Sequence, residues 1–164
     1  MAFDKKQKEK HKKILAIGLT IATAISILDI LGSKFWLSMG ELRHTAYALA
    51  EAPYLKFFWY FAYFVILITT LAYYLGSRDK SESLAIGTAS LFFIWSGLAD
   101  ILYFIFQGKW LPETMPWLID KMPGVTSKYL LGQSTVTPFG LVLNTIIFVI
   151  AGYFITRWLV KQKW

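Results

Sequence analysis

Apolar residues are gathered into four long segments, and polar residues fill the stretches between them. The segments are Ile14–Leu31, Pro53–Leu75, Leu84–Gln107 and Pro138–Leu159. Each is within or near the roughly 17–25 residues that a helix needs to cross a bilayer. The pattern predicts an all-α integral membrane protein: residues 1–164 form a single membrane domain, built as a bundle of four transmembrane helices.

The three connections between these segments differ in kind. The middle one, GSRDKSES at 76–83, is short and polar, and we expect it to do little more than reverse the chain. The outer two, at 33–52 and 108–137, are longer and amphipathic, and they predict short helices at the membrane interface. Ser38 could cap such a helix in the first, and Thr137 followed by Pro138 is typical of the start of the fourth span.

Positive charge is concentrated at one side of this topology. Four crossings place both termini on the same side, and 11 of the 17 basic residues belong to that side, six of them lysines within residues 5–13. Basic residues favour the cytoplasmic side, so we expect both termini in the cytoplasm. The lysine run suits anionic lipid better than nucleic acid, and His11 within it is expected to be solvated.

The composition narrows the functional classes. A chain with 56% hydrophobic residues and a mean hydropathy of +0.49 is too apolar for an ordinary soluble domain. The absence of cysteine excludes disulfides, zinc-thiolate sites and iron–sulfur clusters. The sequence has no phosphate-binding loop, serine-nucleophile elbow or H-E-x-x-H motif, and it indicates no cofactor. Ile14–Gly32 is longer than a usual signal-peptide core and is expected to stay as a membrane helix.

One carboxylate, Asp100, lies inside the third apolar segment. An ionisable residue in a membrane span is costly, so it marks a candidate functional site. Along one continuous helix, a polar face would consist of Ser96, Asp100, Tyr103 and Gln107. Lipid offers no hydrogen-bond partner, so this face should point toward protein or a water-filled cavity. The alternative is that Asp100 only joins two helices by a hydrogen bond.

The other segments carry polar residues at a similar depth. Counting about 1.5 Å per residue places Asp29 and Asp100 roughly 22–24 Å from the inner ends of their helices. The same count brings Tyr60 and Tyr63 of the second segment and Asn144 of the fourth to this layer. Four helices would each contribute a polar group to one site in the outer half of the bundle.

Two carboxylates that share a site of low dielectric constant cannot both ionise cheaply, so one would keep its proton. Asp29 and Asp100 could then perform acid–base chemistry on a bound apolar molecule, or capture an amine or a metal cation. The alternative is that Asp29 reaches interfacial water and never meets Asp100.

A metal site is a weaker possibility in the first outer connection. Glu41 and His44 have the E-x-x-H spacing, and Glu51 would share their helical face. Carboxylate-bridged di-metal bundles use two such motifs and two further glutamates, whereas this chain has one motif. The metal, if any, is not indicated, and a capping role explains Glu41 as well.

Two functions of different classes follow. In the first, the polar layer binds, and could transform, a hydrophobic or lipid-like small molecule, with the tyrosines and Asn144 orienting it. In the second, the chain is a non-catalytic accessory or assembly subunit of a membrane complex, or part of a homo-oligomeric transporter or channel. Small residues such as Gly18, Ala22 and Gly87 would then serve contacts with the partner. A transporter formed by one chain is not favoured, because no pair of broken helices is expected.

Overall fold

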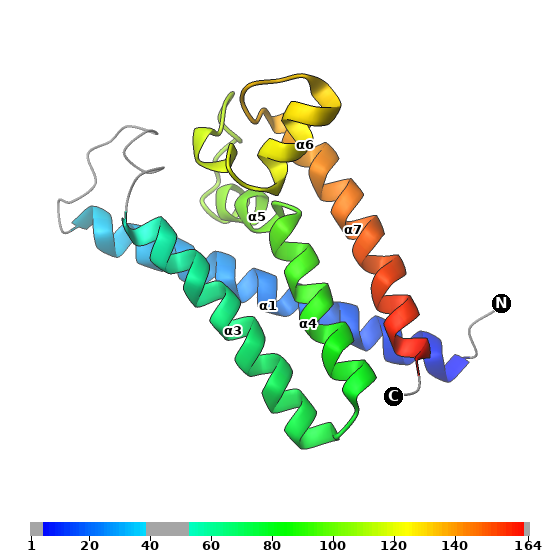
Figure 1. Cartoon of the computed structure of the whole chain (residues 1–164). Helices are drawn as coiled ribbons and strands as arrows, with labels where there is room; N and C mark the ends of the chain where they lie inside the picture. Colours follow the sequence, from blue (N-terminus) through cyan, green and yellow to red (C-terminus); the bar gives the residue numbers. More distant parts are fainter. Residues whose placement is uncertain (1–4, 39–52, 163–164) are drawn as a thin grey trace.

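The computed structural model describes residues 5–38 and 53–162, and side chains within 5–32 and 57–162 of these. All regular elements of the described residues are helical (Figure 1). They are α1 (Lys5–Ser38), α3 (Pro53–Ser77), α4 (Lys80–Trp95), α5 (Leu98–Phe106), the 3-10 helix η1 (Pro116–Leu118), α6 (Met122–Leu131) and α7 (Pro138–Lys161).

Several of these helices are long and apolar enough to cross a membrane. In the described residues they are α1, α3 and α7. Helices α4 and α5 are together also long and apolar enough, as one span that is bent by 64°. Their apolar side chains point largely outward. In α3, for example, only 11% of the most apolar 18-residue stretch is buried inside the molecule. Such length and surface are typical of a multi-pass membrane protein.

The first and third predicted segments differ from the observed helices. Residues 5–13 were expected as a basic segment ahead of the first span, but α1 begins at Lys5 and runs without a break to Ser38. Its 34 residues extend about 50 Å, well beyond a hydrocarbon core of about 30 Å. The third segment is not one helix, because α4 ends at Trp95 and α5 begins at Leu98. The expectation of one continuous helix over Leu84–Gln107 was therefore wrong.

Helix α4 lies at the centre of the molecule, in contact with α1, α3 and α7 (Figure 1). On each side a glycine permits close approach: Gly18 against Ala89, Gly87 against Thr70, and Gly152 against Phe92. A Cβ atom at any of these glycines would lie 2.6 to 2.9 Å from the neighbouring side chain. The small residues that sequence analysis offered for a partner protein thus serve contacts within the chain, and Ala22 is fully buried as well.

Polar contacts join α1, α3 and α4 at the end of the molecule that carries the lysine run, which we call the basic end. The Lys10 ammonium lies 2.7 Å from an Asp79 oxygen and 3.1 Å from a Glu82 oxygen. The Tyr73 hydroxyl donates to Glu82 over 2.9 Å, and Asp79 caps α4 by accepting from the Glu82 amide. The connection at 76–83 therefore fixes the first helix in place as well as reversing the chain.

His11 is also part of the basic end. Only 4% of it is exposed, its Nε2 atom lies 2.9 Å from the Thr156 hydroxyl, and its ring packs edge-on against Tyr153. The expectation that His11 is solvated was wrong, because α1 continues as a helix through the lysine run and turns this position toward α7. The Ser81 hydroxyl donates to the Gln162 carbonyl at the same end.

The opposite end is closed by the segment between α5 and α7. Its apolar cluster consists of Met115, Leu118, Val136 and Leu141. The Met115 amide donates to the Val136 carbonyl over 2.8 Å, which ties the start of this segment to its end. The predicted start of the fourth span is confirmed, since Thr137 accepts a hydrogen bond from the Gly140 amide and Pro138 begins α7.

Asp79 provides a pH test of the basic end. The Lys10 ammonium beside Asp79 holds the pKa of that carboxyl below its ordinary value of 3.8. A carboxyl whose pKa is lowered by folding stabilises the protein fully above its unfolded-state pKa, and the effect is lost as the pH falls through the folded-state pKa. Asp79→Asn keeps an amide that can cap α4 but removes the charge.

We therefore expect Asp79→Asn to lower the thermal unfolding midpoint at neutral pH. The difference from the natural protein should stay constant down to about pH 5 and shrink toward zero below about pH 3.5. Thermal unfolding in detergent at a series of pH values measures this. A difference that is the same at pH 3 and pH 7 would show that the ion pair contributes nothing.

The break between α4 and α5 requires glycine. Gly97 has a φ of 79°, and a Cβ atom there would collide with the Leu141 side chain. Gly108 also has a positive φ, of 63°, but nothing lies within 4 Å of its Cβ position, so a side chain there would meet backbone strain without a collision.

The two glycines allow a matched test. Gly108→Ala should destabilise the folded protein by about 1 kcal/mol because of the left-handed conformation, and Gly97→Ala by about 1–3 kcal/mol more because of the collision. Equal unfolding midpoints for the two variants would contradict close packing at the break.

Candidate functional site

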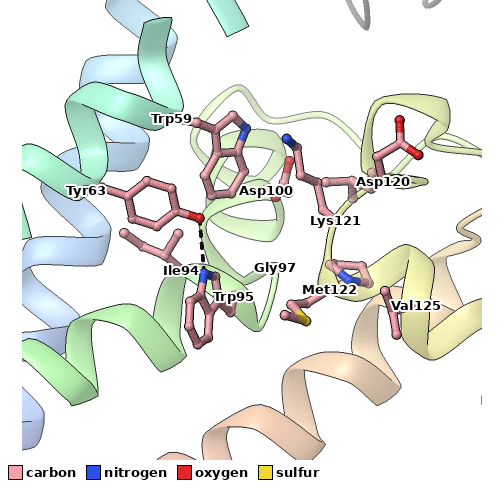
Figure 2. Close-up of a pocket in the computed structure, with 12 residues that line it drawn as sticks. Trp59, Tyr63, Ile94, Trp95, Gly97, Asp100, Asp120, Lys121, Met122 and Val125 are labelled. Atoms are coloured by element: carbon pink, nitrogen blue, oxygen red, sulfur yellow. Dashed lines mark hydrogen bonds between the residues drawn. The ribbon is translucent and has the colours of Figure 1, made fainter. Parts of the chain in front are cut away.

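A pocket of about 300 Å³ lies at the end opposite the basic end (Figure 2). Its walls come from α3, the end of α4, the break, α5 and the segment around residue 120. The residues that line it are Trp59, Tyr63, Ile94, Trp95, Gly97, Asp100, Leu118, Asp120, Lys121, Met122, Pro123 and Val125. The break creates this space, because the 64° bend turns α5 away from the axis of α4.

Asp100 lies in the first turn of α5 and borders the pocket. A carboxylate is stabilised at this position by the helix dipole. Its Oδ1 atom accepts a hydrogen bond of 3.3 Å from the Trp117 indole. A carboxylate has about four acceptor positions, and this long bond from a described side chain occupies one of them.

Asp29 lies on α1, which packs along α5. It is half-buried, and it is close enough to Asp100 for the two charges to interact. Asp29 does not line the pocket itself. The two acids therefore belong to one electrostatic environment, with Asp100 alone facing the pocket.

Aromatic rings form one wall of the pocket. Trp59 and Tyr63 lie one turn apart on α3, with ring centroids 6.1 Å apart. The Trp95 indole on α4 donates to the Tyr63 hydroxyl over 3.1 Å, as Figure 2 shows. Lys121 extends from the opposite side, with its ammonium 5.4 Å from the Trp59 ring centroid.

Asn144 does not line the pocket, and its side chain bonds other parts of the protein. It is fully buried, and its amide nitrogen donates to the carbonyls of Trp95 and Ser96 over 3.0 and 2.8 Å. Its oxygen accepts a hydrogen bond of 2.6 Å from Thr126 on α6. Every polar atom of the Asn144 side chain is thus used to satisfy the broken helix and to attach α6.

The predicted polar face of the third segment is divided by the bend. Ser96 is buried at the end of α4, where its hydroxyl donates to the Phe93 carbonyl and accepts from the Leu98 amide. Tyr103 packs against Phe104, and Gln107 ends α5. Neither lines the pocket. The face predicted for one continuous helix therefore loses Ser96 at the break, while Asp100 and Tyr103 stay on α5 with Gln107 at its end.

Only one of the two candidate tyrosines on α3 lines the pocket. Tyr63 lines the pocket, whereas Tyr60 is 73% exposed on the outside of the helix. Of the predicted residues, the pocket contains Asp100 and Tyr63.

The three candidate metal ligands, Glu41, His44 and Glu51, lie outside the described residues. Within the part of the chain that the structure describes, no three potential ligands are grouped as a metal site would require.

Sequence reasoning missed four residues in or beside the pocket, which come from α3, the end of α4, η1 and the N-cap of α6. Trp59, Trp95, Trp117 and Lys121 were not among the candidates. Trp59 could have been found from its spacing of four residues to Tyr63. The contact of Trp117 with Asp100 had no indication in the sequence, because it depends on how the segment after α5 folds back.

The chain matches no known protein family, and comparisons with curated proteins and with solved structures find no significant match.

Variants of Asn144 test whether its hydrogen bonds stabilise the break between α4 and α5. Asn144→Leu would leave the Trp95 carbonyl and the Thr126 hydroxyl without their partner, which should cost about 1–3 kcal/mol. Thr145→Val is the matched control, because the Ser96 carbonyl that accepts from Thr145 also accepts from Asn144. Thermal unfolding should show a clearly larger loss for Asn144→Leu. Equal losses would mean that Asn144 does not hold the break.

Proposed function

We propose that this chain is a four-span membrane protein that binds a hydrophobic or lipid-like small molecule in the pocket beside Asp100. The observation that carries this proposal is that Asp100 faces a pocket formed by its own chain. A costly carboxylate in an apolar helix is accounted for when it meets a ligand there.

The size and lining of the pocket support a small-molecule site. Its volume is at the lower end of the roughly 300–1,000 Å³ of ligand pockets, which combine apolar walls with a few polar groups. Trp59, Tyr63 and Trp95 would contact the apolar body of the ligand. Asp100 would be its charge or proton partner, and the nearby Asp29 would bias the protonation of Asp100.

The charge distribution supports one orientation. The basic end carries the lysines of α1 together with Arg78, Lys80 and Lys161. By the positive-inside rule this end would lie in the cytoplasm with both termini. The pocket would then open near the outer interface, where an amphiphile can enter with its headgroup at the surface.

The alternative of a non-catalytic subunit, or a homo-oligomeric transporter component, has less support. Asp100 meets a pocket of its own chain, and the close-packing glycines are used between its own helices. Transporters built on broken helices use a corresponding pair in two repeats, and the described residues contain one broken pair.

Asp100→Asn tests the proposal. Native mass spectrometry of the protein extracted from its own membrane should reveal a bound amphiphile on the natural chain and lose it on Asp100→Asn. The matched control is Asp79→Asn, which changes a carboxylate at the other end. Both variants must keep a cooperative thermal transition.

Retention of the same bound species by Asp100→Asn would overturn the role of Asp100. Loss of the fold in Asp100→Asn would show instead that Asp100 is a structural residue. A natural chain that carries no amphiphile, and that takes up none when reconstituted with membrane lipid extract, would contradict the proposed function.

A further inference from the structure

The pocket already holds an ammonium group from its own chain. The Lys121 ammonium lies over the Trp59 ring, 5.4 Å from its centroid (Figure 2). The ion pairs formed by described side chains do not include Lys121, so an aromatic face is what receives its charge. Asp120, its neighbour in sequence, points away from the aromatic wall (Figure 2).

The wall around this ammonium has the chemistry of a cation site. Tryptophan offers the most favourable ring face for a cation, and Trp59 and Trp95 both line the pocket with Tyr63. The hydrogen bond from Trp95 to Tyr63 fixes two of the three rings relative to each other. Such preorganised rings bind a cation without further ordering of side chains.

The negative charge lies on the same pocket. Among the described side chains, Trp117 donates a long hydrogen bond of 3.3 Å to Asp100, and the other lone pairs of the carboxylate could accept from an ammonium. The charge of Asp29 reaches Asp100 from α1 and adds to the negative potential. An ammonium headgroup favours the ionised form of Asp100 and can pair with it, whereas an anionic headgroup would be opposed by any negative charge on this carboxyl.

We infer that the pocket binds the headgroup of an organic cation, an amphiphile with one ammonium group, and that the Lys121 side chain competes with this headgroup for the face of Trp59. This inference rests on the proposed function and names its ligand class. Lys121 sits at the N-cap of α6, and its flexible four-carbon stem lets the ammonium leave the ring while the backbone stays in place.

The experiment uses three photoreactive probes with the same alkyl chain and a diazirine near the headgroup, which is an ammonium, an alcohol or a carboxylate. The full chain is kept in micelles of an uncharged maltoside detergent, which carries no ammonium group, and labelling of peptides from 57–63 and 118–125 is measured by mass spectrometry. We expect the ammonium probe to label these peptides about tenfold more efficiently than the alcohol, and the carboxylate least.

Variants test the competition. Lys121→Met, which keeps the length of the side chain, should raise the ratio of ammonium labelling to alcohol labelling several-fold. Asp100→Asn should reduce the ammonium probe to the level of the alcohol. Lys109→Met is the matched control, because Lys109 is exposed and lies outside the pocket. Lys121→Gln repeats the test if Lys121→Met has a lower unfolding midpoint.

The outcomes separate this inference from the proposed function. Equal labelling of the pocket by the ammonium and alcohol probes would overturn the cation preference and leave the amphiphile pocket intact. Reduced ammonium labelling in both Lys121 variants would overturn the competition. If no probe labels the pocket peptides in the natural chain or in Lys121→Met, the proposed function fails together with this inference.

Discussion

The structure depends on how the interrupted backbone between α4 and α5 is satisfied. Inside a membrane a helix can break only where other protein groups replace the lost backbone hydrogen bonds. Here Asn144 and Thr145 of α7 donate to the carbonyls at the end of α4. Helix α7 therefore permits the bend between α4 and α5, and the bend produces the pocket.

The same bonds connect the pocket to the segment that covers it. Asn144 also accepts from Thr126, so α6 is attached to the residue that satisfies the break. A second attachment is the hydrogen bond from Trp117 to Asp100. The covering segment is thus held to the core by two polar contacts and one apolar cluster, and Lys121 lies between these attachments.

The sequence predicts the helices well and the site in part. Apolar length located α1, α3 and α7, and the Thr137 cap placed the start of α7 correctly, because these properties are local. The break was missed although Gly97 marks it, since a single glycine is common in membrane helices and its left-handed conformation depends on Leu141 and Asn144. Asp100 and Tyr63 were predicted and line the pocket, whereas the side chain of Asn144 bonds Thr126 and the carbonyls at the end of α4.

Sequence reasoning could not distinguish polar side chains that hydrogen-bond within the protein from polar side chains that face a pocket. Asn144, Ser96 and His11 are all buried and all have protein partners. Asp100 differs from them because it faces a space, not a backbone carbonyl or a hydroxyl. That difference, more than the presence of a charge in an apolar segment, is what makes Asp100 the candidate for a binding group, and it arises from a bend that the apolar pattern alone does not encode.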